Sequence, residues 1–413
     1  MKIKIRQEKD CFLVYLLDAR RIVGVNQAGA AILDMLFNRD MTAEEISQTT
    51  SQKWDIPIEQ ARQEIGDFLE QTNVEVDPNG FNVLEEEQLV APLGAELEIT
   101  TDCNLRCLHC YDEVHDVRHM PLEIANRIIG ILDDNGVCEI SLIGGEPFRY
   151  PWIMELLETC QNRDMTINLV SNATLITDEI IAKLATIKRL VMVISLDGTQ
   201  EIHDYIRGKG VFQKADATIR KLIAANIACE TIFTLNSVNA SVYREFIEYC
   251  EGLGIPCNFS IFKPFREDHK DLIIDPDKFF EILIDLMNMR IKKKYKVGMA
   301  SAAIVAELLG FPPRNECRAT KSGLVINIDG HMVTCPSLET AGFYQPDQLP
   351  VFDENFTRTW QEHEVFENFR HSNLRECQAR ALLFSGDVNG YDPYGLTAFI
   401  KYWGTRKAEV QTI

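Results

Sequence analysis

The stretch Thr101-Asp-Cys-Asn-Leu-Arg-Cys-Leu-His-Cys-Tyr111 places three cysteines, Cys103, Cys107 and Cys110, in the spacing CxxxCxxC. Cysteine thiolates hold iron–sulfur clusters, and one cluster normally takes four of them. Three thiolates this close can therefore hold three irons of a [4Fe–4S] cluster and leave the fourth iron for a ligand from outside the chain. The alternatives are three unrelated thiols or a zinc site, which usually needs a second cysteine pair or histidines further along.

Length and composition restrict the class of protein. A chain of 413 residues predicts two or three domains. Acidic residues outnumber basic ones by 62 to 42, which argues against nucleic-acid binding because that needs a basic surface. Twelve cysteines without an apolar N-terminal segment predict a reducing cytoplasm, and metal binding rather than disulfides. The sequence has no apolar run of about 18 residues, so we expect no membrane span.

Residues 1–75 are predicted to form a small domain of three strands followed by three helices, similar to a winged helix. After it, residues 76–93 contain Asp77-Pro-Asn-Gly and a run of three glutamates, which is typical of a polar linker. The strands are expected at Met1–Ile5, at Phe12–Leu17 and after the turn Asp18–Arg21, and the helices at Asn26, at the capping box Thr42–Glu45 and at Pro57.

Between residues 94 and 300, apolar strands alternate with amphipathic helices, which predicts a parallel sheet covered by helices in a partial (β/α)6 barrel. Active sites of such barrels lie at the C-terminal ends of the strands, and the cysteine loop directly follows the first strand. The strands are expected at Leu97–Thr100, Glu139–Ile143, Thr166–Val170, Leu190–Ser195, Thr231–Leu235 and Asn258–Phe262, and the helices near 121–135, 151–163, 178–187, 213–226 and 240–253.

Small and polar residues follow the next strands at the same end of the barrel. Glycines permit close backbone approach, so bare carbonyl groups there can meet an ammonium group. Hydroxyl and carboxylate groups suit the ribose hydroxyls of a nucleoside, although each is equally typical of a helix cap or a turn. After the second, third and fourth strands the residues are Gly144, Gly145 and Glu146, then Ser171 and Asn172, then Ser195 and Asp197.

The cysteine spacing and the run Gly144-Gly-Glu-Pro147 together resemble the radical S-adenosylmethionine (SAM) enzymes. The resemblance implies that the open iron binds the amino and carboxyl groups of SAM, and that the Gly-Gly-Glu-Pro backbone binds the methionine amine. Judged without the resemblance, Arg207 could also be a surface charge and Tyr111 an aromatic residue of the core. The resemblance assigns Arg207 to the SAM carboxylate, and implies further SAM contacts at Thr234 and Asn236 after the fifth strand and at Tyr111 after the last cysteine.

The N-terminal run Val25-Asn-Gln-Ala-Gly-Ala-Ala-Ile-Leu33 is similar to the peptide chaperones of the pyrroloquinoline-quinone-D (PqqD) type. These are also called recognition elements for ribosomally made, post-translationally modified peptides. The resemblance implies that the leader of a precursor peptide adds as a strand to the sheet edge and packs against a helix. Edge addition is physically ordinary because an open edge offers unpaired N–H and C=O groups. The alternative is a dimerisation or packing domain.

Residues 301–413 contain a second cysteine set. Cys317 and Cys335 flank a predicted hairpin, Gly323–Thr334, which turns at Asp329-Gly330, and Cys377 follows later. This pattern resembles the SPASM and twitch extensions of radical SAM enzymes, which hold auxiliary clusters. The SPASM pattern has cysteines where this chain has Arg380, Gly386, Gly390 and Gly395.

The shorter twitch pattern, with one auxiliary cluster bound by Cys317, Cys335 and Cys377, therefore matches better. Its fourth iron is open, takes a substrate thiolate or takes an unusual ligand such as Arg380, although arginine is normally protonated. The alternative is a vestigial domain without metal.

The expected function is a radical SAM maturase of a ribosomally made peptide. A donor such as flavodoxin or ferredoxin would reduce the cluster at Cys103, Cys107 and Cys110, and SAM cleavage would give a 5′-deoxyadenosyl radical. The product would be a thioether or a carbon–carbon crosslink. The enzymatic alternatives are an anaerobic sulfatase-type maturase and a haem-pathway decarboxylase. The non-enzymatic alternative is a peptide-binding electron-transfer protein.

Overall fold

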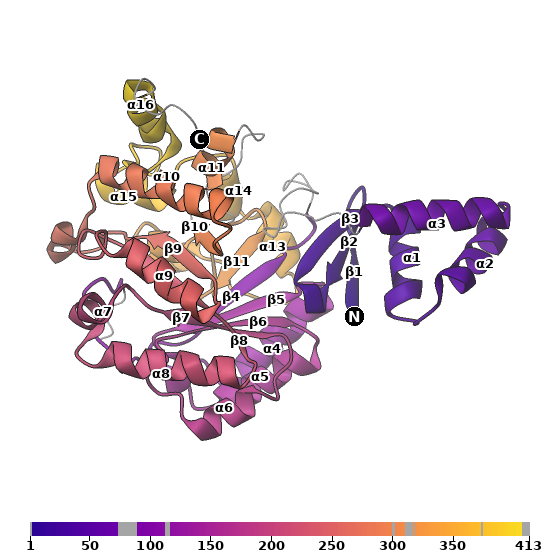
Figure 1. Ribbon diagram of the computed structural model, residues 1–413, viewed down its shortest axis with the longest axis horizontal. Helices are drawn as coiled ribbons and strands as arrows, with labels where there is room; N and C mark the ends of the chain where they lie inside the picture. Colours follow the sequence, from indigo (N-terminus) through magenta and orange to yellow (C-terminus); the bar gives the residue numbers. More distant parts are fainter. Residues whose placement is uncertain are drawn as a thin grey trace.

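The computed structural model describes residues 2–72, 89–111, 116–299, 302–309, 317, 319–372 and 375–406. A small N-terminal domain projects from a larger α/β body that contains the rest of the chain (Figure 1). Within the described residues, no helix combines the length and the apolar character that a membrane span would need.

The N-terminal domain has the predicted three strands and three helices. Asn26 caps the first helix by accepting a hydrogen bond from Gly29, and Thr42 and Glu45 form the predicted capping box of the second. The first strand lies two residues later than predicted. The antiparallel sheet has the order β1 (Ile3–Gln7), β2 (Phe12–Leu16), β3 (Arg21–Val25), and the helices are α1 (Gln27–Phe37), α2 (Ala43–Trp54) and α3 (Ile58–Thr72).

The central body is the predicted parallel sheet with its strands in sequence order. Side chains of strands such as β7 are buried along nearly their whole length, as is typical of parallel strands in α/β folds. The strands are β4 (Gly94–Thr100), β5 (Glu139–Gly144), β6 (Thr166–Ser171), β7 (Leu190–Ser195), β8 (Ala228–Leu235) and β9 (Cys257–Ile261).

Helices connect these strands largely as predicted. The sequence analysis missed two of them, the short helix α7, which ends at Arg207, and the long helix α10 after the last barrel strand. The helices are α4 (Leu122–Asp134), α5 (Ile153–Asn162), α6 (Asp178–Leu184), α7 (Gln200–Arg207), α8 (Val211–Ala224), α9 (Tyr243–Leu253) and α10 (Pro276–Lys292).

The C-terminal region continues the barrel sheet. The predicted hairpin forms from β11 (Gly323–Ile326) and β12 (Met332–Val333), and β11 pairs in parallel with β4. On the opposite edge, β10 (Val297–Met299) pairs with β9. The predicted boundary at residue 300 therefore falls within one continuous sheet. Helices α11 (Ala302–Leu309), α12 (Pro336–Thr340), α13 (Phe356–Glu362), α14 (Glu364–Arg370), α15 (Gln378–Ser385) and α16 (Leu396–Arg406) complete the region.

The N-terminal domain packs against the barrel at the end opposite to the cysteine loop. Leu13, Tyr15 and Leu17 belong to the same buried core as the barrel strands. Arg20 lies 3.7 Å from the carboxylate of Glu139, the first residue of β5. Because all barrel strands run in parallel, the strand ends near this domain are N-terminal, whereas the cysteine loop lies at the C-terminal ends.

A buried ion pair fixes the junction between the N-terminal domain and the barrel. Arg6 Nε lies 2.6 Å from Glu8 Oε1, and the same guanidinium donates to the carbonyls of Ala91 and Pro92 at 2.9 Å each. Glu8 also accepts a hydrogen bond from the Val90 amide at 2.6 Å. Of the predicted linker 76–93, residues 76–88 lie outside the described part. The remaining residues are not a solvated linker, because this network holds them against the protein.

We expect Arg6→Met to lower the stability of the protein by about 3 kcal/mol, because it leaves Glu8 as a buried carboxylate without a cation. The measurement is the urea midpoint followed by circular dichroism. Adding Glu8→Leu to this variant should recover part of the loss. Arg358→Met is the control, because it breaks an exposed pair with Glu362, which contributes about 0.5 kcal/mol or less. Equal losses in Arg6→Met and Arg358→Met would contradict the prediction.

Candidate functional site

The cysteine loop begins directly after β4 and is held by main-chain hydrogen bonds. The amide of Gly145 donates to the carbonyl of Thr100, and that of Glu146 donates to the carbonyl of Asp102, both at 2.8 Å. Within the loop, the Cys110 amide donates to the Cys107 carbonyl at 3.1 Å. The loop that carries the three half-buried cysteines therefore packs against the end of the neighbouring strand, β5.

The two glycines after β5 are required by this contact. Gly144 has φ of +142°, and a Cβ atom there would overlap the carbonyl oxygen of Thr100. A Cβ atom at Gly145 would overlap the carbonyl oxygen of Asp102. The sequence analysis explained these glycines by close approach to a ligand. The structure adds a packing reason, since any side chain at either position would displace the cysteine loop.

Glu146 joins the ends of β5 and β6. Its side chain is 1% exposed, and its carboxylate accepts hydrogen bonds from the Ser171 hydroxyl at 2.7 Å and the Asn172 amide at 2.8 Å. Burial raises the pKa of Glu146, and these hydrogen bonds oppose the shift. The side chains of Glu146 and Ser171, both predicted to contact SAM, are thus bonded to each other within the protein.

Asn172 holds the cysteine loop from the β6 side. The side-chain nitrogen of Asn172 donates to the side-chain oxygen of Asn104 at 3.0 Å, and the side-chain nitrogen of Asn104 donates to the Thr174 hydroxyl at 2.8 Å. Thr174 in turn donates to the Asn172 side chain. Asn104, which lies between Cys103 and Cys107, is a positioning residue that the sequence analysis missed. An asparagine inside a metal-binding loop was the available signal.

Asp197 and Arg207 form a buried ion pair beside the cysteine loop. Asp197 is fully buried, and its carboxylate lies 2.5 Å from Arg207 Nε and accepts from the Thr234 amide at 2.8 Å. Burial works to raise the pKa of Asp197, but the attraction of Arg207, together with the neighbouring histidines and the Thr234 amide, outweighs burial and the pKa is lowered. The structure therefore brings three predicted site residues, from the loop after β7, from α7 and from β8, into direct contact.

Arg207 also reaches a cluster cysteine. Its Nη1 lies 3.8 Å from Cys107 Sγ, and its Nη2 lies 3.5 Å from His109 Nε2. Burial raises the pKa of the Cys107 thiol to about 11, and the Arg207 guanidinium opposes this shift. Burial lowers the pKa of His109 to about 4, so its ring is neutral at neutral pH. A cation beside a cysteine suits a site that holds anionic sulfur.

Three further predicted residues lie around this group. Asn236 is buried, and its side chain bonds to the carbonyl of Thr234 at 3.0 Å and to the amide of Val238 at 2.9 Å, which closes the turn after β8. Ser195 is half-buried at the end of β7. Tyr111 is 39% exposed, with its ring centroid 5.9 Å from that of Phe265.

The second cysteine set also comes together. Burial raises the pKa of the Cys317 thiol to about 12, and the nearby Cys335 and Cys377 raise it further. No three His, Cys, Asp or Glu side chains in the described part of the chain gather closely enough to hold a single metal ion. A [4Fe–4S] cluster does not need such a group, because each of its thiolates binds a different iron.

Arg380 is committed to an ion pair. It is 3% exposed, and its Nε lies 3.0 Å from each carboxylate oxygen of Asp392. Asp392 also accepts hydrogen bonds from the amides of Cys377 and Tyr394, at 3.0 Å each. A guanidinium bonded in this way keeps its charge, which argues against Arg380 as an iron ligand. The pair instead positions the loop that carries Cys377.

Two segments of the chain match known family models. Residues 97–250 match the radical SAM superfamily, and residues 14–73 match coenzyme PQQ synthesis protein D (PqqD). Both resemblances drawn from the sequence are therefore confirmed. Neither match extends into the region of Cys317, Cys335 and Cys377.

Curated relatives include maturation proteins. The chain is 31% identical over 168 residues to the sporulation killing factor maturation protein SkfB of Bacillus subtilis, a match that spans 40% of each chain. It is 26% identical over 295 residues to the mycofactocin maturase MftC of Mycobacterium tuberculosis, covering 69% of this chain and 74% of that protein.

Solved structures share the fold. The crystal structure of Streptococcus suis SuiB bound to the precursor peptide SuiA aligns with a TM-score of 0.69 at 15% identity, over 94% of this chain and 97% of that chain. SuiB bound to S-adenosylmethionine aligns with a TM-score of 0.64 at 17% identity, over 89% of both chains. The family implies SAM and a [4Fe–4S] cluster, and the half-buried cysteines beside Arg207 suit the cluster.

We expect Arg207→Gln to make the reduction potential of the reconstituted cluster more negative, because it removes a positive charge and an N–H donor next to Cys107 Sγ. Asp197→Asn should shift the potential in the opposite direction, since it leaves the Arg207 charge unpaired. The measurement is an anaerobic redox titration followed by electron paramagnetic resonance. Arg220→Gln, on the surface of α8, is the control. Shifts of the same sign in both site variants would contradict the prediction.

Proposed function

This chain is an enzyme with a PqqD domain and a radical SAM domain, and we propose that it modifies a ribosomally made precursor peptide by SAM-dependent radical chemistry. The observation that carries the proposal is the position of the three cysteines at the C-terminal ends of the barrel strands, beside the buried Arg207–Asp197 pair. The bound cluster supplies reductive cleavage of SAM to methionine and a 5′-deoxyadenosyl radical.

The protein positions and shields this chemistry. Cys103, Cys107 and Cys110 would hold the cluster, and the hydrogen bonds from the ends of β5 and β6 fix their loop. We assign the backbone of Gly144 and Gly145 and the guanidinium of Arg207 to SAM. Ser195, Thr234 and Tyr111 line the same end of the barrel. An external donor such as flavodoxin or ferredoxin supplies the electron.

We assign the second cysteine set to an auxiliary cluster, which would serve as the acceptor for the surplus electron left when the substrate radical couples. Cys317, Cys335 and Cys377 give three thiolates, and Arg380 is bonded to Asp392. This leaves the fourth iron for a thiolate of the substrate. We therefore favour thioether formation over a carbon–carbon crosslink.

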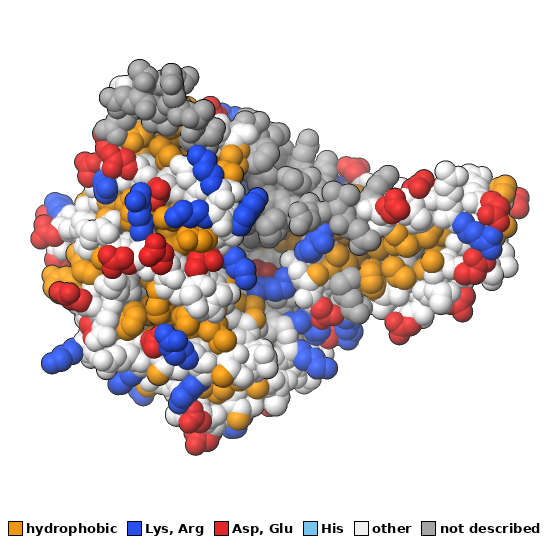
Figure 2. Space-filling model, in the orientation of Figure 1, with side chains coloured by type: hydrophobic (Ala, Val, Ile, Leu, Met, Phe, Trp, Pro, Cys, Tyr) orange, Lys and Arg blue, Asp and Glu red, His pale blue; other side chains and the backbone are white. Residues whose placement is uncertain are grey.

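The leader of the precursor is assigned to the outer edge of β3. Figure 2 shows hydrophobic side chains gathered in a band across the N-terminal domain alongside α3. Val25 at the end of β3 and Phe68 of α3 are half-buried, and a Cβ atom at Gly29 would meet both of them. An extended peptide at this edge would pair with the backbone of β3 and place alternate side chains against α3.

The central test is SAM cleavage. Anaerobically reconstituted protein should form 5′-deoxyadenosine from SAM, and Cys103→Ala should abolish this because the cluster loses an iron ligand. Cys317→Ala should retain SAM cleavage and lose peptide modification. Cys11→Ala, a half-buried cysteine of the N-terminal domain, is the control for both activities. Chromatography with mass spectrometry measures both products. Wild-type protein that forms no 5′-deoxyadenosine would disprove the proposal.

The assignment of the leader site can be tested at the two sheet edges. In an antiparallel sheet, successive residues of a strand point their N–H groups alternately toward one neighbouring strand and away from it. The Leu17 amide donates to the Lys2 carbonyl, and this bond fixes which residues of each strand face β2 or β3. The N–H groups of Gly24 in β3 and Gln7 in β1 therefore point outward, away from β2. Gly24→Pro removes an outward donor without breaking the ladder, and should weaken precursor binding about tenfold. Gln7→Pro makes the matched change at the opposite edge and should leave binding unchanged. Calorimetry gives both affinities, and the reverse pattern would assign the leader to β1.

A further inference from the structure

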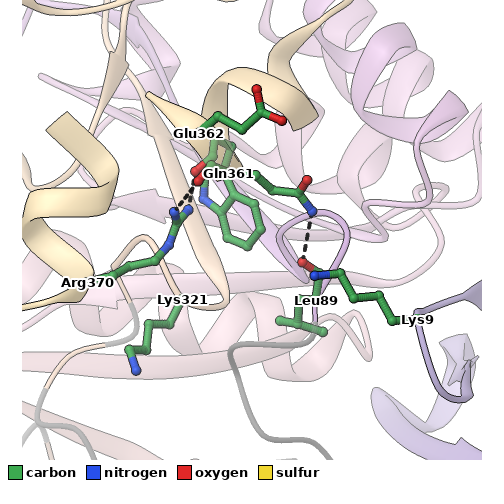
Figure 3. Close-up of a pocket in the computed structure, with 7 residues that line it drawn as sticks. Lys9, Leu89, Lys321, Gln361, Glu362 and Arg370 are labelled. Atoms are coloured by element: carbon green, nitrogen blue, oxygen red, sulfur yellow. Dashed lines mark hydrogen bonds between the residues drawn. The ribbon is translucent and has the colours of Figure 1, made fainter. Parts of the chain in front are cut away.

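A small cavity lies at the junction of the N-terminal domain and the C-terminal region (Figure 3). Its volume is about 270 Å³. Lys9 comes from the turn between β1 and β2, Leu89 precedes β4, and Lys321 precedes β11, while the other walls come from α13 and α14. Because β4 has seven residues, this cavity and the cysteine loop lie at opposite ends of a strand about 23 Å long.

The charged groups around the cavity are mostly cationic. Lys9, Lys321 and Arg370 line it, and the single acid is Glu362. Glu362 pairs with Arg358 at 2.8 Å. Figure 3 shows the Glu362 carboxylate turned away from the guanidinium of Arg370. The cavity is therefore locally positive on a chain whose formal charge is −20.

Arg370 is held in place by main-chain carbonyls. It donates to the carbonyl of Thr320 at 2.7 Å, to that of Gln361 at 3.0 Å, and to that of Trp360. None of the carboxylates in the described part of the chain forms an ion pair with Arg370. Burial lowers the pKa of Arg370, and the attraction of nearby Glu367 opposes this shift without cancelling it.

Trp360 adds an unused donor. It is 2% exposed, Arg370 lies over its ring at 4.7 Å, and its indole N–H has no hydrogen-bond partner among the described residues. Buried N–H groups are nearly always bonded, and an unbonded one costs about 1–3 kcal/mol. A buried donor, with Lys9 and Arg370 at the same small cavity, matches a ligand that brings acceptor oxygens and negative charge.

We propose that this cavity binds a carboxylate, and that its natural occupant is an acidic side chain of the precursor peptide. The identity of the occupant rests on the proposed function. Lys9 belongs to the domain that reads the leader, and Trp360 and Arg370 belong to the region that carries the second cysteine set. A carboxylate held between them gives the peptide a second contact beyond the edge of β3. The volume admits one such side chain.

The first arm of the test uses small probes on the full chain at constant ionic strength. N-acetylglutamate N-methylamide should change the intrinsic tryptophan fluorescence saturably, and the matching glutamine amide should not. Lys9→Glu should weaken binding of the glutamate probe at least fivefold. Lys53→Glu, which changes an exposed lysine of α2 in the same domain, should leave that binding unchanged. Trp360→Phe should remove the response. Equal effects of the two lysine variants, or equal responses to the two probes, would overturn the proposal.

The second part of the experiment determines whether the bound carboxylate comes from the precursor peptide. Inorganic phosphate that binds as tightly as the glutamate probe would show a general anion site and reject the assignment to a peptide. Once the precursor peptide is identified, changing its acidic residues to amides one at a time should reveal one whose loss weakens binding to the wild-type protein at least fivefold and has no effect on binding to Lys9→Glu. If no such residue exists, the assignment to the precursor is wrong. SAM cleavage is measured in parallel, so a protein that forms 5′-deoxyadenosine without this coupling rejects only the cavity proposal.

Discussion

The parallel pairing of β4 on both of its sides is the constraint on which the rest of the structure depends. Gly94 of β4 pairs with Glu139 of β5 on one side and with Gly323 of β11 on the other. The first pairing brings the cysteine loop against the Gly144-Gly145 turn. The second attaches the hairpin between Cys317 and Cys335 to the same sheet. One strand thus sets the positions of both cysteine sets, although they lie far apart in the sequence.

Buried ion pairs occupy each junction that this arrangement creates. Arg6 and Glu8 join the N-terminal domain to the barrel, Arg207 and Asp197 face the first cysteine set, and Arg380 and Asp392 hold Cys377. Desolvation cancels much of the attraction within such a pair, so its net contribution to stability is small. The effect of such a pair on geometry is larger, because removing either member leaves the other as a buried charge without a partner. We interpret these pairs as devices that fix relative position rather than as sources of stability.

Sequence patterns predicted the features that depend on local chemistry. The capping residues Asn26 and Thr42 and the six-strand alternation were predicted correctly because caps and periodicity act within a few residues. Helix α7 was missed since its eight residues follow a tight turn and carry few apolar positions. The pairing of β11 with β4 could not be predicted from the sequence. The two strands lie far apart along the chain, and the residue pattern of neither strand indicates its partner.

The predicted site residues illustrate the same division. Glu146, Ser171 and Asn236 stand where the pattern places SAM contacts, yet their side chains bond to the protein itself. A motif records that a residue type is needed at a position, and does not say whether a ligand or a neighbouring loop needs it. Their SAM contacts therefore stay predictions.

Arg380 shows how one substitution changes the chemistry available to the second cysteine set. In the twitch pattern a cysteine at this position would supply the fourth thiolate, whereas here a guanidinium fills it and is neutralised by Asp392. A thiol at position 380 would leave the Asp392 carboxylate buried without its cation, so the cysteine cannot simply be restored. The amide of Cys377 depends on the same carboxylate. For the auxiliary cluster proposed above, Arg380 supplies no thiolate and its partner Asp392 holds Cys377 in place, which is the arrangement expected if the fourth ligand arrives with the substrate.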